Sequence, residues 1–179
     1  SNPSNSTGLK VARMNPVTPV SPSQNTNMMT ENEIGTAIIQ AAIELHKNLG
    51  PGLLESVYEI VLAHELTGRG LTVRRQVPVS IAYKGIVFEE AFRADLVINN
   101  RVIIELKSVE TLNNAHRKQL QTYLRLTGMK LGYILNFGAA LMKEGIVRAV
   151  NGLEETPHPL RVPAPLSEVD NPRAETRGR

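Results

Sequence analysis

Apolar residues recur every three or four positions after residue 30, a period that predicts a helix with one buried face. Its apolar positions are Ile34, Ala37, Ile38, Ala41 and Leu45. Thr30 followed by Glu33 is a capping-box pattern, so the helix is expected to begin there. Glycine and proline at residues 49–52 end it. A second helix is expected over residues 53–66, closed by the glycines that follow.

Short apolar and alternating stretches dominate the middle of the chain and predict strands. The expected strands cover residues 71–77, 79–83, 86–90, 93–98 and 102–107, with turns at 84–85 and 99–100. A third helix over residues 114–127 stops at Gly128, and strands over 131–137 and 145–150 follow. Two helices, a run of hairpins and a helical crossover together predict an α/β fold, in which helices flank a mixed β-sheet.

Proline and aromatic residues divide the 179-residue chain into three parts. Nine of the eleven prolines lie before residue 30 or after residue 153, whereas all seven aromatic residues lie between. Segments rich in turn formers and without a sustained period bury too little apolar surface to offset the entropy of ordering. We therefore expect disordered tails over residues 1–29 and 154–179, and one folded domain over residues 30–153.

Composition excludes several classes of protein. With no cysteine, the chain holds no disulfide scaffold, no cysteine-ligated zinc and no thiol nucleophile. No apolar run is long enough to cross a bilayer and the N-terminus lacks a signal-peptide pattern, so we expect a cytoplasmic protein without a membrane partner. The net charge is +3, and seven basic against three acidic residues between Arg93 and Lys130 suit either a polyanion or a solvated helix face.

The stretch over residues 102–107 carries the first candidate chemistry. Alternation places Ile103, Glu105 and Lys107 on one face, and both faces begin apolar, as in a central strand covered on two sides. A carboxylate and an ammonium on such a strand are costly unless each has a partner or a metal. A salt-bridged pair of Glu105 and Lys107 is the simpler alternative.

Asp95 bears on the choice between a metal site and a salt bridge. Its position depends on the register of the preceding hairpin. A two-residue turn at 99–100 sets Asp95 opposite Ile104, whereas a three-residue loop over 99–101 sets it opposite Glu105. An asparagine in the left-handed conformation makes the second loop accessible. We predict this second register, which brings two carboxylates beside an ammonium and supplies the oxygen ligands that Mg²⁺ or Mn²⁺ prefers.

Asp95 followed by Glu105-Leu106-Lys107 resembles the signature of the PD-(D/E)XK nuclease superfamily, with Ala94 where the signature has proline. This resemblance implies a restriction-endonuclease-like fold in αβββαβ order, here with an extra N-terminal helix. It also implies a hydrolase that cleaves phosphodiester bonds of nucleic acid, with DNA as the expected substrate.

Two further patterns extend the resemblance along the chain. Gln119 and Tyr123 form a QxxxY on the third helix, similar to RecB-like members of the superfamily. Residues 52–58 fit GxxExxY, the pattern that names one branch of it. With these patterns, the resemblance spans about residues 33–150.

The resemblance implies a role for each residue of the signature. Asp95 and Glu105 are the expected ligands of a Mg²⁺ or Mn²⁺ cofactor, with the Leu106 carbonyl as a further oxygen. Lys107 is expected to assist the attacking water. Glu55 on the second helix is the expected third carboxylate ligand, and a solvated helix glutamate is the equal alternative.

Substrate contacts are expected on the third helix and the first strand. Gln119 and Tyr123 share a helix face and would reach one phosphate or base, although helix packing explains them nearly as well. Arg117 and Gln76 are further candidates for substrate binding. Glu59 is expected on the surface.

Two other functions remain open. A non-catalytic nucleic-acid-binding or adaptor module would keep the nuclease fold without cleavage, in line with the weak net charge and the shortage of aromatic residues for base stacking. A partner-binding protein without nucleic acid would need a dimeric or heteromeric interface. The sequence does not fix the oligomeric state, and a homodimer stays among the options.

Overall fold

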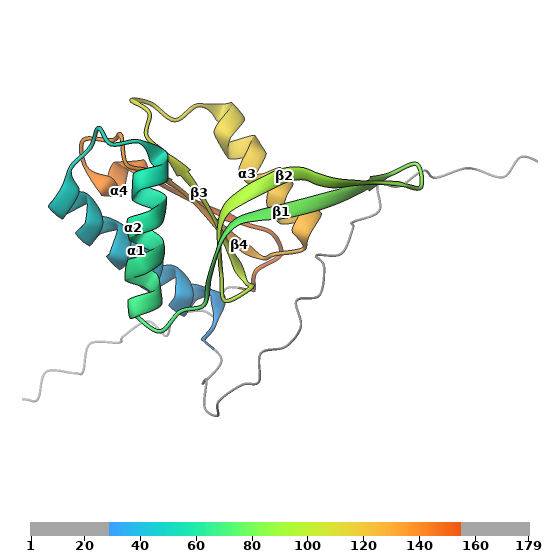
Figure 1. The fold of residues 1–179 in the computed structure, drawn as a ribbon, viewed down its shortest axis with the longest axis horizontal. Coiled ribbons are helices and arrows are strands. Elements are labelled where there is room, and N and C mark those ends of the chain that lie inside the picture. Colours follow the sequence, from blue (N-terminus) through green and yellow to red (C-terminus); the bar gives the residue numbers. More distant parts are fainter. Residues whose placement is uncertain (1–28, 155–179) are drawn as a thin grey trace, which may run out of the picture.

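The computed structural model describes residues 29–154 (Figure 1). Its helices are α1 (Glu31–Leu49), α2 (Glu55–Gly68), α3 (Asn114–Thr127) and the short α4 (Met142–Gly145). Its strands are β1 (Val73–Tyr83), β2 (Ile86–Ile98), β3 (Val102–Lys107), β4 (Leu131–Asn136) and β5 (Ile146–Val150). Within this range, no helix has the length and apolar content of a membrane span. The predicted tails lie outside it, apart from their innermost residues.

The five strands form one mixed sheet in the order β1-β2-β3-β4-β5. β3 and β4 are parallel and are joined through the crossover helix α3, while the other neighbouring pairs are antiparallel. α1 and α2 cover one face of the sheet and α3 covers the other (Figure 1). The predicted α/β fold, a mixed sheet flanked by helices, is confirmed.

Two apolar clusters hold the helices to the sheet. The larger cluster joins α1 and α2 to the central strands and includes Leu62 and Ile104, which are fully buried. The smaller cluster lies under α3 and includes Leu120 and Ile103. Because Ile103 and Ile104 belong to different clusters, β3 is covered on both faces, as the sequence predicted.

Two elements that carry candidate site residues, β3 and α3, have the predicted bounds. β3 covers residues 102–107 and α3 covers residues 114–127. The first helix also begins as predicted, because Thr30 Oγ1 accepts a hydrogen bond from Glu33 N (3.3 Å) while Glu33 Oε2 accepts one from Thr30 N (2.7 Å). Local side-chain chemistry therefore fixes where α1 starts.

The long hairpin differs from the prediction, which divided it into four short strands. β1 runs through Pro78, because a proline is tolerated on an edge strand. β2 runs through a bulge, where the register shifts between Val79 and Ile81 and Glu90 adopts a φ of 56°. The short helix α4 has no counterpart in the prediction.

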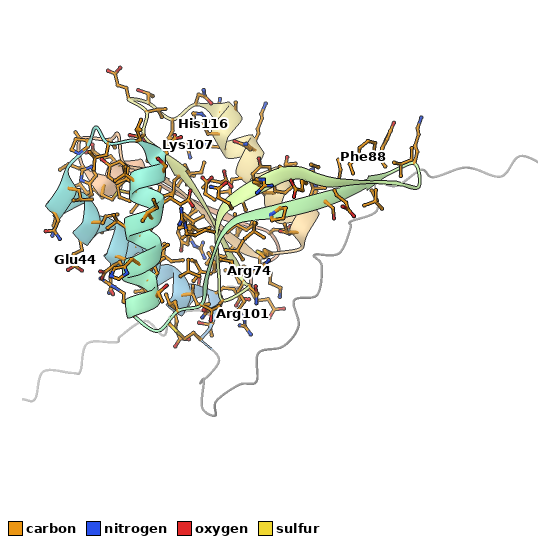
Figure 2. The ribbon with its side chains drawn as sticks, in the orientation of Figure 1. Glu44, Arg74, Phe88, Arg101, Lys107 and His116 are labelled. Atoms are coloured by element: carbon orange, nitrogen blue, oxygen red, sulfur yellow. The ribbon has the colours of Figure 1, made fainter. Side chains whose placement is uncertain are left out.

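Beyond this bulge, β1 and β2 extend away from the core as a two-stranded arm, residues 80–91 (Figure 1). Its tip is apolar and exposed, with Tyr83, Ile86, Val87 and Phe88 accessible to solvent. Figure 2 places Phe88 far out on the arm, away from the helices. The arm therefore lies apart from the two apolar clusters that hold the helices to the sheet.

Gly138 lets the loop after β4 pack against the chain just beyond β3. A β-carbon at this position would lie 2.7 Å from the backbone nitrogen of Val109. We expect Gly138→Ala to lower the free energy of unfolding by roughly 1–3 kcal/mol, since a backbone neighbour does not move aside as a flexible side chain does.

Gly68→Ala is the matched control, because nothing lies within 4 Å of its β-carbon and it occupies a helix end. Urea denaturation measures both variants. If Gly138→Ala were as stable as the wild type, the close packing beside β3 would be contradicted.

Candidate active site

β2 and β3 separate partway along the sheet. They pair only as far as Leu96 and Ile104, whereas β3 stays paired with β4 up to Lys107. β2 instead continues with β1 toward the arm. We call the place where they separate the fork, formed by Asp95 on β2 and residues 105–107 on β3. α2 lies on one side of it and α3 on the other (Figure 1).

The register across the fork is the one predicted from the sequence. β2 and β3 are joined by a three-residue loop, residues 99–101. Both asparagines of this loop adopt left-handed φ angles, 49° and 54°, where the prediction needed one. With Leu96 paired with Ile104, Asp95 lies opposite Glu105 one position further along.

Asp95 is fixed by the backbone of β3. Its Oδ2 accepts a hydrogen bond from Leu106 N at 2.8 Å. Burial raises the pKa of Asp95, while this hydrogen bond and the charge of Lys107 act in the opposite direction. The carboxylate therefore occupies the position where β2 no longer pairs with β3.

Glu105 is a buried carboxyl group with an unsatisfied oxygen. Its side chain is 4% exposed, and within residues 29–154 Glu105 Oε1 is a buried atom with no hydrogen-bond partner. Burial, and then the charge of Asp95, raises the pKa of Glu105 to about 8. The charge of Lys107 and a hydrogen bond from the Asp95 backbone offset part of this effect. A donor or a cation at Oε1 would relieve this cost.

Lys107 lies at the end of β3, half-buried (Figure 2). Its charge lowers the pKa of both Asp95 and Glu105. None of the ion pairs among the described residues involves Lys107. The alternative interpretation, a salt bridge between Glu105 and Lys107, is therefore not what the structure contains, although the ammonium charge acts on both carboxylates of the fork.

Glu55 lies beside the fork but is held by other contacts. Its Oε1 accepts a hydrogen bond from Ser108 N (3.1 Å), and Ser108 Oγ donates to Leu53 O (2.7 Å). In the part of the chain that the structure describes, no group of three or more His, Asp or Glu side chains is placed to hold one metal ion. The structure thus brings Asp95 and Glu105 together, and Glu55 lies near enough for its charge to raise the pKa of Glu105.

Gln76 reaches the fork from β1, as the sequence suggested. Its Nε2 lies 3.4 Å from Asp95 Oδ1 and donates to Glu59 Oε2 at 2.7 Å. Glu59 itself was expected on the surface, and that expectation is wrong, because the residue is 6% exposed. The signal was available, since Glu59 precedes the buried Leu62 and Leu66 by three and seven residues on one helix face.

Tyr58, the last residue of the GxxExxY pattern, belongs to the core. Its hydroxyl donates to Gly50 O (2.6 Å) and accepts from Leu53 N (3.2 Å), and its ring stacks on Phe137 with centroids 4.3 Å apart. The side chain is fully buried. Its role is to close the connection between α1 and α2.

Gln119 and Tyr123 lie together on the fork side of α3. Gln119 Nε2 donates to the Tyr123 hydroxyl at 2.7 Å, and the Tyr123 ring stacks on Phe92 with centroids 3.7 Å apart. Burial raises the pKa of Tyr123, and the charges of Glu105 and Asp95 act in the same direction. Tyr123 therefore lies near enough to the two carboxylates for their charges to act on it.

These residues line a groove of about 540 Å³ between α3 and the arm. Its lining includes Phe92 and Ile81 from the hairpin and Lys118, Gln119 and Tyr123 from α3. The predicted substrate contact at residue 117 is not among the lining residues, because that arginine is exposed elsewhere on the helix.

Comparison with known protein families gives a match over most of the chain. The sequence model of the PD-(D/E)XK nuclease superfamily matches residues 32–149. Searches among curated proteins and among solved structures give no match. The family match covers both strands of the fork, α2 and α3.

Glu105 should make the metal-free protein sensitive to pH. The pKa of this carboxyl is about 8 when folded, against an ordinary value of 4.5, so the folded state binds a proton more tightly across this window. The free energy of unfolding should therefore fall as pH rises from about 5 to about 8. Burial of Asp95 adds to the same trend.

Glu105→Gln removes this ionisable group and keeps its shape. In EDTA at pH 8, we expect the variant to be more stable than the wild type by roughly 1–3 kcal/mol, and the difference should shrink toward pH 5. Urea denaturation at the two pH values measures it, with Glu65→Gln on the solvent side of α2 as the control. If the wild type were as stable as Glu105→Gln at pH 8, the conclusion that Glu105 carries an unsatisfied carboxylate oxygen would be contradicted.

Proposed function

The chain belongs to the PD-(D/E)XK nuclease superfamily, and from this membership we propose that it is a divalent-metal-dependent nuclease that hydrolyses phosphodiester bonds, with DNA as substrate. The observation that carries the proposal is the position of Asp95 opposite a buried Glu105 whose Oε1 has no hydrogen-bond partner among residues 29–154. Within the superfamily we assign the chain to the GxxExxY branch, on the pattern at residues 52–58 and the RecB-like QxxxY of α3.

The fork suits a hard divalent cation. Asp95 and Glu105 supply carboxylate oxygens, and the Leu106 carbonyl is the further oxygen that we propose. The unsatisfied Oε1 of Glu105 and the mutual repulsion of the two carboxylates both favour a bound cation. We propose Mg²⁺ or Mn²⁺, since each takes carboxylate, carbonyl and water oxygens. Glu55 stays the proposed third carboxylate: its Oε1 holds the end of β3 through Ser108, and its charge also raises the pKa of Glu105.

Lys107 supplies the second element of the proposed chemistry. The metal, when bound, would polarise the scissile phosphate and lower the pKa of an attacking water. The Lys107 ammonium, without an ion-pair partner among residues 29–154, would orient that water and stabilise negative charge as it develops on the phosphate. Phosphodiesters resist attack through their own negative charge, so a fixed cation addresses the barrier directly.

The groove beside α3 supports nucleic acid as the substrate. α3 carries Arg117, Lys118 and Arg125 and no acidic residue, so its field attracts a phosphate backbone. Lys118, Gln119 and Tyr123 line the groove, and Tyr123 is coupled to the carboxylates of the fork. A strand lying along the groove would bring a phosphate toward Lys107 and would place a base against an aromatic ring.

Cleavage tests the proposal directly. The purified protein should cut single- or double-stranded DNA with Mg²⁺ or Mn²⁺ and should stop when EDTA is added. Asp95→Asn and Lys107→Ala should lower the rate by about a hundredfold or more, because each removes a charge from the fork. Glu65→Gln, on the exposed side of α2, should cleave like the wild type.

The outcomes separate the candidate functions. Salt-dependent DNA binding without cleavage, unaffected by Asp95→Asn, would identify a non-catalytic module that keeps the nuclease fold. If the wild type and Glu105→Gln were equally inert toward DNA and RNA and bound neither, a partner-binding protein would replace both functions. Gel electrophoresis of end-labelled strands and a mobility-shift assay give these results.

Tyr123 should contribute to substrate affinity through its ring. In the Glu105→Gln background, which should bind without cutting, we expect Tyr123→Ala to weaken binding of a single-stranded oligonucleotide roughly tenfold, since a base–aromatic contact contributes about 1–3 kcal/mol. Tyr123→Phe keeps the ring and removes the hydrogen bond from Gln119, so it should retain most of the affinity. Fluorescence anisotropy measures both, and equal loss in the two variants would show that the hydroxyl, not the ring, contacts the strand.

A further inference from the structure

Glu59 is a buried charge on the inner side of α2, and both of its oxygens are engaged. Oε1 accepts a hydrogen bond from Arg75 Nε (2.8 Å), and Oε2 accepts one from Gln76 Nε2 (2.7 Å). The side chain of Glu59 is 7% exposed, while that of Arg75 is 45% exposed. A buried carboxylate is retained only when it is paired and hydrogen-bonded, and here it is both. The role of Glu59 therefore depends on Arg75 and Gln76, which donate these hydrogen bonds.

The two donors are consecutive residues of one strand. Side chains of consecutive strand residues normally point to opposite faces of a sheet. Arg75 and Gln76 nevertheless reach the same carboxylate, because Gln76 adopts a left-handed φ of 49°. A non-glycine residue in this region is strained and persists where surrounding contacts require it. The strained position is thus the one that joins Glu59 to the fork.

The amide of Gln76 lies between two carboxylates. Its Nε2 is 2.7 Å from Glu59 Oε2 and 3.4 Å from Asp95 Oδ1. An amide nitrogen donates two hydrogen bonds, whereas a reversed amide would place its oxygen against two acceptors. The two carboxylates therefore select one orientation of the amide, and Glu59 makes the shorter contact.

We propose that Glu59 is a positioning residue of the metal site, acting through Gln76 to fix the orientation of the Asp95 carboxylate. The contacts run from Glu59 to Gln76, from Gln76 to Asp95, and from Asp95 to the Leu106 backbone, so they connect α2 with three strands. A ligand that is already oriented loses less freedom when it binds a metal, and such outer contacts raise metal affinity. This inference rests on the proposed function and adds a residue outside the signature patterns.

Direct binding of Mn²⁺ tests the proposal. Isothermal titration of the full chain with Mn²⁺ should show a dissociation constant roughly tenfold or more higher in Glu59→Gln than in the wild type. Glu65→Gln is the matched control, because Glu65 also lies on α2 and also pairs with an arginine, Arg69, away from the fork. It should bind Mn²⁺ like the wild type.

A double-mutant cycle distinguishes positioning from the loss of a nearby charge. Gln76→Ala should weaken Mn²⁺ binding on its own, and adding Glu59→Gln to it should change the dissociation constant no further. If the effect of Glu59→Gln persisted in full in the Gln76→Ala background, the proposed route through Gln76 would be overturned. The side chain of Gln76 is exposed. Gln76→Ala therefore tests the contact of Gln76 with Glu59 and Asp95 even if Glu59→Gln reduces the fraction of folded protein.

Melting temperatures of the same proteins separate this inference from a structural role. A Glu59→Gln protein that melts earlier yet binds Mn²⁺ with wild-type affinity would overturn the inference and leave the proposed function standing. A wild type that neither binds Mn²⁺ nor cleaves DNA would instead reject the proposed function, and the inference with it.

Discussion

The fork depends on one hydrogen bond in which a side chain takes the place of a strand partner. Where β2 separates from β3, the N–H of Leu106 is satisfied by the Asp95 carboxylate at 2.8 Å. Buried backbone donors need a partner, so this bond allows the sheet to open without an unpaired N–H. The same bond holds a negative charge beside Glu105, and this charge adds to the effect of burial in raising the pKa of Glu105. The charges of the candidate site therefore follow from the way the sheet opens.

α2 supports the fork through side chains on one of its faces. Glu55 holds the Ser108 N–H just after β3, Tyr58 closes the loop that leads into the helix, and Glu59 binds Gln76 on β1. Positions three and four apart share a helix face, so these contacts follow from helical geometry. The GxxExxY pattern thus has a structural explanation in this chain: it fixes a helix against the end of β3.

Local chemistry explains which parts were predictable from the sequence. The register of Asp95 depends on a short loop of two asparagines, and loop length with left-handed residues is a local property. The left-handed Gln76 is different, because tertiary contacts from α2 impose its φ. The burial of Glu59 could have been predicted from its helix face, but its partners could not: strict alternation would have placed only one of its two donors, Arg75 and Gln76, on the side of α2.

β1 is an edge strand of eleven residues, and an exposed edge is a template for pairing with another chain. Pro78 offers no N–H to such a neighbour, and the left-handed backbone of Gln76 interrupts the row of donors and acceptors two residues earlier. The edge beside the fork is therefore protected against strand addition. The residues that shape the site from β1 also keep separate molecules from joining their sheets there, and they confine any such pairing to the arm.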